Sequence, residues 1–132
     1  KKALINCLEN AKLNPSDVDY INAHGTGTIL NDATETSAIK DVFREHAKFL
    51  KISSTKPLHG HALAASGSME LNAVLLAINE KIIPPTINFS EPDPACDLDY
   101  VTNRPEEKNV SIALSNSFAF GGLNVVLALK KV

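Results

Sequence analysis

The sequence predicts a single α/β domain, and three observations support this fold class. Segments with the periodicity of helices alternate with short strand-like segments along the chain. Hydrophobic residues make up 44% of the 132 residues, which is enough for a packed core and excludes a disordered chain. No repeat, low-complexity segment or linker divides the sequence, so we expect residues 1–132 to form one domain.

The first part of the chain is expected to alternate between helix and strand. The four segments are helix 1–13, strand 18–23, helix 33–47 and strand 50–54. Pro15 ends the first helix, because the residue before a proline disfavours helical geometry. Asn31 or Asp32 is expected to cap the second helix, since short polar side chains accept hydrogen bonds from the free N–H groups of a first turn.

The later part of the chain predicts a long helix and a closing pair of strands. The expected segments are helix 62–81, surface loop 88–96 and strands 110–115 and 124–130. The first half of the helix is rich in small residues, which indicates close packing against another backbone. Pro84 and Pro85 end the helix. The last two strands are joined across Gly121 and Gly122, and such a hairpin beside helix-connected strands makes the sheet mixed.

Charge and cysteine content exclude several classes of protein. With 13 basic and 15 acidic residues the formal net charge is −2, so a general nucleic-acid binder has no electrostatic support. No apolar run approaches the roughly 20 residues that cross a bilayer, and the first residues do not form a signal segment. Cys7 and Cys96 are too few for a disulfide scaffold and indicate a reducing, cytoplasmic setting. We expect Cys7 to be a small core residue and Cys96 to be incidental.

The first motif with chemical potential is His24-Gly25-Thr26-Gly27-Thr28, directly after a predicted strand. Its glycines allow tight backbone turns, and its threonines offer hydroxyls to a polar ligand. A phosphate-cradling loop is one alternative, although the lysine of a P-loop is missing. Taken alone, the motif favours an ordinary turn with a surface histidine.

The second motif is Lys56-Pro57-Leu58-His59-Gly60-His61, which opens the small-residue helix. A histidine at a helix start stays neutral near pH 7, because the positive end of the dipole disfavours its charged form. A neutral imidazole that donates a hydrogen bond polarises a carbonyl oxygen well. The competing interpretation is a metal site from His59 and His61, which lacks a cysteine or carboxylate at the usual spacing. His46, elsewhere, is expected to be solvated.

The third motif is Asn116-Ser117-Phe118-Ala119-Phe120-Gly121-Gly122. Two phenylalanines beside a double glycine fit a core plug followed by a hairpin turn. They equally fit the lining of an apolar tunnel, with a backbone N–H presented where the glycines permit close approach.

The three motifs in this order, with Ser53-Ser54-Thr55 before Lys56, resemble the C-terminal half of a β-ketoacyl synthase. These are the condensing enzymes of fatty acid and polyketide assembly, here of the type with a Cys-His-His active site. The resemblance covers Pro15 to Lys130. It implies a thiolase-like, layered αβαβα fold, of which this chain supplies the C-terminal α/β half with a mixed sheet.

The resemblance also implies a reaction and its residues. In this family a cysteine takes an acyl group from acyl carrier protein, malonyl thioester is decarboxylated, and the carbanion attacks the acyl-cysteine, without a metal or organic cofactor. By similarity His24 and His61 hydrogen-bond the malonyl thioester carbonyl and stabilise the enolate. Lys56 is the buried lysine of the site, expected to pair with Glu35. Glu70 is the acidic residue behind the site, where it could hold an ordered water.

Four further residues match family positions at the mouth of the site. Thr26 and Thr28 match the threonines that contact the pantetheine arm. Phe120 matches the gating phenylalanine whose backbone N–H completes the acyl oxyanion hole, and Phe118 lies beside it. Ala119, Leu123 and His59 depart from the residues usual at their positions, which puts chain length and gating in doubt.

The nucleophile is missing from the resemblance, because neither Cys7 nor Cys96 stands at the matching position. The chain is therefore expected to be a fragment, inactive alone and poorly soluble or oligomeric without its N-terminal half. The implied partners are acyl carrier protein with its acyl and malonyl thioesters, that N-terminal half, and a second copy in a homodimer; nucleic acid and membrane are not expected.

Two other members of the superfamily stay open as alternatives. The first is a non-catalytic partner subunit like the chain-length-setting paralogues, which often lose site histidines. The second is a thiolase or an initiating synthase. The initiating type has asparagine in place of the second histidine, so Gly60-His61 argues against it. The basic residues Lys40, Arg44, Lys48 and Lys51 could contact a carrier protein, although a solvated face is the simpler interpretation.

Overall fold

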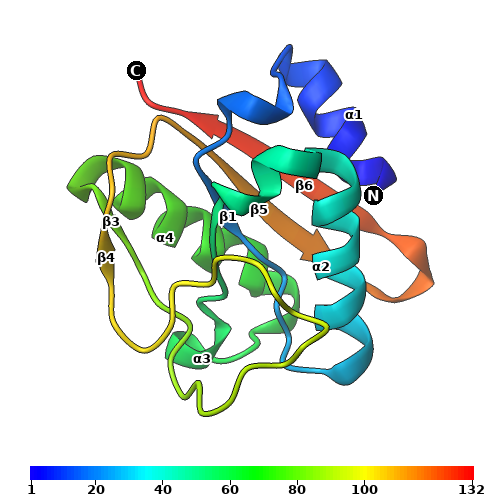
Figure 1. The fold of residues 1–132 in the computed structure, drawn as a ribbon, viewed down its shortest axis with the longest axis vertical. Coiled ribbons are helices and arrows are strands. Elements are labelled where there is room, and N and C mark those ends of the chain that lie inside the picture. Colours follow the sequence, from blue (N-terminus) through cyan, green and yellow to red (C-terminus); the bar gives the residue numbers. More distant parts are fainter.

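A computed structural model describes residues 1–132, and it places a four-stranded sheet at the centre of the molecule (Figure 1). The strands are β1 (Tyr20–Asn22), β2 (Lys51–Ser53), β5 (Ile112–Phe118) and β6 (Asn124–Lys130), in the order β2-β1-β5-β6. β1 pairs in parallel with both β2 and β5, whereas β5 and β6 are antiparallel. The predicted α/β class and mixed sheet are confirmed.

Helices cover both faces of this sheet. The helices are α1 (Lys2–Ala11), α2 (Ile29–Phe43), α3 (Lys56–His59) and α4 (Ser66–Glu80). Short 3-10 turns span Pro15–Asp17, Arg44–Lys48, Leu63–Ala65 and Phe120–Gly122. A second ladder joins β3 (Ile82–Ile83) to β4 (Glu106–Glu107) in antiparallel register, which the sequence analysis did not predict.

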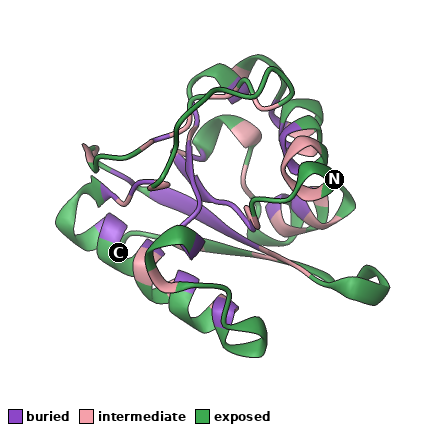
Figure 2. Ribbon diagram, turned by 90° about the horizontal axis from the view of Figure 1, so that it is seen from below, coloured by how far each residue is buried: buried purple, intermediate pink, exposed green.

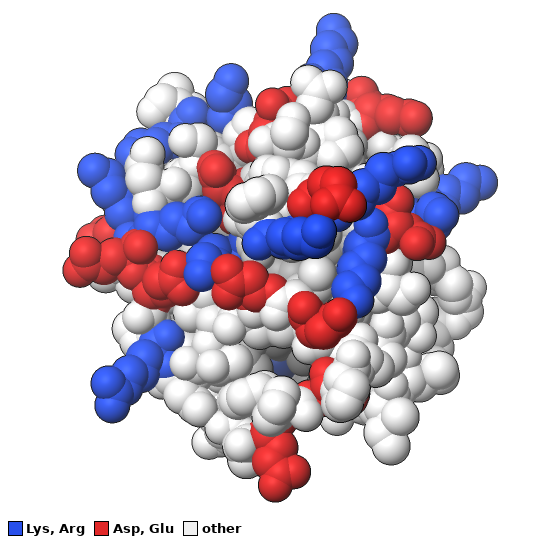
Figure 3. Space-filling view, viewed as in Figure 1, with Lys and Arg blue, Asp and Glu red and all other residues white.

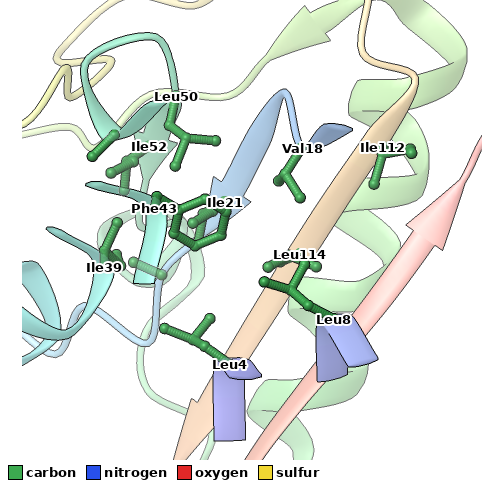
Figure 4. Close-up of a cluster of buried hydrophobic side chains, with 12 residues drawn as sticks. Leu4, Leu8, Val18, Ile21, Ile39, Phe43, Leu50, Ile52, Ile112 and Leu114 are labelled. Atoms are coloured by element: carbon green, nitrogen blue, oxygen red, sulfur yellow. The ribbon is translucent and has the colours of Figure 1, made fainter. Parts of the chain in front are cut away.

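Alternation along the strands divides the core between the two faces, and the buried residues gather on the sheet and the inward sides of the helices (Figure 2). On one face, Ile21 and Leu114 pack among residues of α1 and α2 (Figure 4). Those helix residues are Leu4, Leu8, Ile39 and Phe43. On the other face, Tyr20 and Ala113 pack against α4 through Val74, Ala77 and Ile78. The result is three layers, helix over sheet over helix.

The helix predicted over 33–47 spans Ile29–Phe43 instead, so it begins and ends earlier than expected. Thr28 caps α2, since its Oγ1 accepts a hydrogen bond from the Asn31 N–H at 3.4 Å. The two expected caps, Asn31 and Asp32, instead lie inside the helix, and Asn31 donates its side-chain amide to Asp32 and Glu35. At the other end Arg44 adopts a φ of 50°, which stops the α-helix and leaves a 3-10 turn.

The small-residue segment was predicted to pack closely throughout, and this is only partly right. α4 begins at Ser66 rather than at 62, so the preceding residues lie in a loop and a 3-10 turn. Ser66 is buried and Gly67 lies against β5, where an added Cβ would meet Ser117 Oγ at 3.4 Å. The alanines 62, 64 and 65 are exposed. Close packing therefore holds only at the first turn of α4.

Acidic and basic side chains are interleaved on the surface seen in Figure 3. Lys40 pairs with Asp97, Lys48 with Glu45, and Lys51 with both Asp99 and Glu106. Three of the four basic residues considered for a carrier surface are thus already paired within the chain. None of the helices has the length and apolar character needed to cross a membrane.

Candidate active site

Two histidines from distant parts of the chain meet at the carboxyl end of β1. His24 follows this strand and is buried, with 8% of its surface exposed. The ring centroids of His24 and His61 are 5.7 Å apart, and the rings are nearly perpendicular at 86°. Phe118, at the end of the neighbouring β5, lies 5.5 Å from the His24 ring. The structure thus brings together three of the residues that the sequence motifs singled out.

Lys56 links His24 to the interior of the protein. Its ammonium group forms an ion pair with Glu70 and donates a hydrogen bond to the His24 carbonyl oxygen. It also lies 3.3 Å from His24 Nδ1, so its three N–H groups have three partners. Lys56 is 5% exposed and Glu70 is fully buried. The expected pairing of Lys56 with Glu35 is wrong, because the partner is Glu70 on α4.

Glu35 is occupied by the backbone of the first motif. Its carboxylate accepts hydrogen bonds from the N–H groups of His24 and Gly25, at 2.9 and 3.0 Å, and from the Asn116 side chain at 2.9 Å. Burial raises the pKa of Glu35, and these hydrogen bonds oppose that rise. Glu35 therefore fixes the turn that carries His24, which explains why it is not free to pair with Lys56.

Gly25 is required in that turn. Its φ is +44°, in the left-handed region, and an added Cβ would lie 2.5 Å from Cβ of Ser54. Ser54 in turn donates a hydrogen bond to the Gly25 carbonyl at 2.8 Å. The close contact between the two loops sets the distance between His24 and the segment that carries Lys56.

Hydrogen-bond geometry assigns the proton of each site histidine. Nδ1 of His61 accepts the Leu63 backbone N–H at 3.1 Å, so the neutral ring carries its proton on Nε2. Nδ1 of His24 faces the Lys56 ammonium, which has only protons to offer, so here too the proton is on Nε2. Burial, the positive charge of Lys56 and the nearby His61 lower the pKa of His24 to about 4. The site thus holds two imidazole N–H donors.

His61 does not lie at a helix start, as the sequence analysis expected. It precedes α4 by five residues and meets that helix only through Ser66, whose Oγ lies 3.0 Å from Nδ1. The histidine is therefore oriented by local hydrogen bonds. These bonds come from Leu63 and from Ser66, the first residue of α4.

The residues at the mouth of the site lie at different places. Phe120 is fully exposed in the 3-10 turn that connects β5 to β6. Thr26 and Thr28 form a mutual hydrogen bond of 2.9 Å. Both threonines line a cavity of about 510 Å³, and three other candidate site residues also line it. These are Lys56, Glu35 and His61.

The sequence did not predict a group of buried polar side chains on β1 and at the end of β2. The Asn22 amide group donates hydrogen bonds to Tyr20 and Thr55, at 3.3 and 3.2 Å, and Tyr20 pairs with Ser53 at 2.8 Å. Burial raises the pKa of Tyr20 to about 12. A polar Asn22 inside a short apolar strand was the signal that could have pointed to this group.

The remaining candidate residues have structural surroundings. His46 was expected to be solvated, but its Nε2 lies 2.9 Å from the Val18 carbonyl. Cys7 is half-buried against the core, as predicted, and Cys96 is half-buried in the wall of the cavity beside the site. No group of three or more histidine, cysteine or acidic side chains is arranged to hold a metal ion.

Comparison with known proteins relates this geometry to one family. The family described as "Beta-ketoacyl synthase, C-terminal domain" matches residues 1–90. The chain belongs to this family. Nodulation protein E of Rhizobium meliloti is 53% identical over 132 residues, which are 100% of this chain and 33% of that protein. For 3-oxoacyl-(acyl-carrier-protein) synthase 2 of Synechocystis sp., the identity is 52% over 130 residues, 98% of this chain and 31% of the synthase.

Solved structures give the same answer for the fold of this β-ketoacyl synthase domain. A type II polyketide ketosynthase in complex with its acyl-carrier protein superposes with a TM-score of 0.97 at 40% identity, over 99% of this chain and 32% of that one. The ishigamide ketosynthase/chain length factor gives a TM-score of 0.93 at 41% identity, over 98% and 32%. The thiolase-like fold is thereby confirmed. The chain spans about a third of the length of these relatives.

Proposed function

We propose that this domain is the C-terminal part of a 3-oxoacyl-(acyl-carrier-protein) synthase that joins a malonyl unit to an acyl group in fatty acid or polyketide synthesis. The observation that carries the proposal is the pair of neutral imidazoles with ring centroids 5.7 Å apart, each with its proton on Nε2. Two N–H donors on neighbouring rings suit a carbonyl oxygen that becomes negatively charged.

Decarboxylation uses these donors directly. The bond between the malonyl methylene carbon and its carboxylate breaks, carbon dioxide leaves, and the electron pair passes into an enolate whose oxygen is the former thioester carbonyl. Hydrogen bonds from His24 and His61 stabilise this oxygen more strongly as its charge grows, which lowers the barrier. The enolate carbon then attacks the acyl thioester on a cysteine, and the cysteine thiolate is released.

Lys56 and Glu70 prepare His24 for this step. The Lys56 ammonium group occupies Nδ1 of His24 and its positive charge disfavours protonation of that ring, so the ring remains a neutral donor. Glu70 compensates the charge of Lys56, which would otherwise be costly to bury. Lys56 and Glu70 therefore act through His24, and Glu35 acts by fixing the turn that carries it.

The remaining roles concern substrate delivery. Thr26 and Thr28 line the cavity beside His61 and are placed to contact a pantetheine arm with their hydroxyls. Phe118 contacts His24, and the exposed Phe120 would serve as the gate and present its backbone N–H to the acyl carbonyl once the rest of the enzyme surrounds it.

The catalytic cysteine is proposed to lie in an N-terminal part of the enzyme outside residues 1–132, which as a whole form the C-terminal domain. Cys7 lies on α1 and packs against the core, and Cys96 lies in a loop. The proposed partners are acyl carrier protein, that N-terminal part and a second copy of the enzyme, in the cytoplasm and without a metal or organic cofactor. Ketosynthase neighbours include one in complex with its acyl-carrier protein, which supports the first of these partners.

Intact-mass spectrometry of the full-length protein tests the proposal against its main rival, a non-catalytic subunit like a chain length factor. After incubation with an acyl thioester of acyl carrier protein, we expect the mass of one acyl group on a cysteine outside residues 1–132. An unmodified protein would favour the non-catalytic subunit. Acylation at Cys7 or Cys96 would contradict the proposed location of the nucleophile.

A further inference from the structure

His59 lies between Lys56 and His61 in the sequence. Its side chain contacts the residue that precedes each of them. Its Nε2 is 3.2 Å from Oγ1 of Thr55, the residue before Lys56. Its Nδ1 is 2.8 Å from the carbonyl oxygen of Gly60, the residue before His61. One imidazole thus spans the two ends of the single turn of α3 (Lys56–His59).

The directions of these hydrogen bonds follow from the buried groups. The Asn22 amide group donates to Thr55 Oγ1 at 3.2 Å, so that hydroxyl accepts one bond and still has its own proton to place. Thr55 is 1% exposed, and the other partner of its hydroxyl is His59 Nε2. Thr55 therefore donates to Nε2, which must be unprotonated. The Gly60 carbonyl can only accept, so Nδ1 of His59 carries the proton.

This arrangement makes the His59 tautomer opposite to that of the two site histidines. His24 and His61 accept on Nδ1 and carry the proton on Nε2, whereas His59 accepts on Nε2 and carries it on Nδ1. A doubly protonated His59 would leave the Thr55 hydroxyl proton without an acceptor in a buried position, which is unfavourable.

Lys56 anchors the buried start of the turn through Glu70 and His24, and backbone hydrogen bonds close the turn itself. Its hydrogen bonds are Leu58 N–H to the Thr55 carbonyl at 2.9 Å and Gly60 N–H to the Lys56 carbonyl at 2.7 Å. Gly60 adopts a φ of 82°, and the space where a Cβ would lie is open. The side chain of His59 is thus the bridge between the buried start of this turn and its exposed end.

From this geometry we propose that His59 is a positioning residue for the proposed condensation, a role that rests on the proposed function. As a neutral imidazole protonated on Nδ1, it ties the residue before Lys56 to the residue before His61. It thereby fixes the distance between the lysine that prepares His24 and the second donor to the enolate. Catalytic donors must be held within fractions of an ångström to be effective.

The first test is neutron crystallography of the deuterated full-length enzyme at about pH 8. We expect scattering density for deuterium on Nδ1 of His59 and on Nε2 of His24 and His61. Deuterium on Nε2 of His59, or on both of its nitrogens, would overturn the proposal. This measurement does not depend on enzyme activity, so it separates the role of His59 from the function of the whole enzyme.

The second test compares variants in the full-length enzyme by the rate of carbon dioxide release from malonyl thioester. His59→Ala should lower kcat about tenfold while KM changes less than twofold, because the donors are misplaced but the thioester still binds. His59→Gln can accept from Thr55, and His59→Asn can donate to Gly60, so each should recover part of the loss. His46→Ala, a histidine with one backbone contact elsewhere, is the matched control and should retain the parent rate.

The variant outcomes are decisive in both directions. Equal losses in the Ala, Gln and Asn variants, or no loss in any of them, would contradict a role through these two hydrogen bonds. Thermal melts identify any variant that fails to fold. If a variant fails to fold, the His59 tautomer seen by neutron crystallography of the parent enzyme tests the proposal instead. A parent enzyme that releases no carbon dioxide would contradict the proposed function instead.

Discussion

Removing Lys56 or Glu70 should destabilise the full-length protein strongly, because each would leave the other charge buried. Lys56 is 5% exposed and Glu70 is not exposed at all. Breaking a buried pair by removing one partner costs about 3–5 kcal/mol, against about 0–1 kcal/mol for an exposed pair. We expect Lys56→Ala and Glu70→Ala each to lower the free energy of unfolding by about 3–5 kcal/mol.

The double variant separates a buried ion pair from two independent packing losses. With both charges gone, no uncompensated charge remains, so Lys56→Ala/Glu70→Ala should be more stable than the sum of the single effects by about 2 kcal/mol or more. Urea unfolding of the four proteins measures this coupling. Lys48→Ala, which breaks the exposed pair with Glu45, is the control and should leave the midpoint unchanged.

Additive single effects, or single losses below about 1 kcal/mol, would refute the reasoning. They would mean that Lys56 and Glu70 are not a buried pair in the folded protein. The proposed control of His24 by the ammonium group would then lose its basis, whatever the activity of the variants.

Three other predictions follow from the site and the surface. Because the pKa of folded His24 is lowered to about 4, the histidine takes up a proton on unfolding between about pH 4 and 6.5. Its contribution to the free energy of unfolding is therefore complete above pH 6.5 and is lost as the pH falls. His24→Asn should reduce the slope of the unfolding free energy against pH, near pH 5, by about 1.4 kcal/mol per pH unit. Gly25→Ala should lower the thermal unfolding midpoint by about 5 °C or more, because the added Cβ would clash with Ser54 and the φ of Gly25 is +44°. The control Gly67→Ala should shift the midpoint little, since its Cβ would make only an ordinary contact with Ser117. Similar midpoints for the two variants would contradict the turn assigned to Gly25. Residues 1–132 expressed alone should oligomerise in sedimentation experiments, because Leu76 of α4 is 60% exposed and Val125 and Leu127 of β6 are 44% and 45% exposed; a stable monomer would contradict this.

Local signals in the sequence were sufficient for the fold class, whereas the meeting of the two histidines was implied by the resemblance to β-ketoacyl synthases. The strand before His24 and the pattern Gly60-His61 are recognisable without knowledge of any contact. Parallel strands then place their carboxyl ends at one edge of the sheet, and the loops that follow β1 and β2 become neighbours.

The partner of Lys56 could not be predicted in the same way. Glu35 and Glu70 are both acidic residues on helices near the site, and sequence spacing does not show which one faces the lysine. The choice is made by the turn at His24 and Gly25, whose N–H groups need an acceptor and take the carboxylate of Glu35.

The cap of α2 was mispredicted for a related reason. Thr28, Asn31 and Asp32 are all residues that favour the cap position, so local preference alone does not choose among them. The side chain of Asn31 is used instead toward Glu35, a contact within the first turns of the helix. The sequence therefore identified the helix but not its first residue.

Release of carbon dioxide from malonyl thioester by the full-length protein tests the role of the two imidazoles most directly. His24→Ala and His61→Ala should each lower this rate about 10²–10³-fold, the usual cost of removing one donor to a developing oxyanion. Transfer of an acyl group to the enzyme should stay close to the parent rate in both variants. Release at the parent rate by either variant would show that the histidine it replaces does not stabilise the enolate.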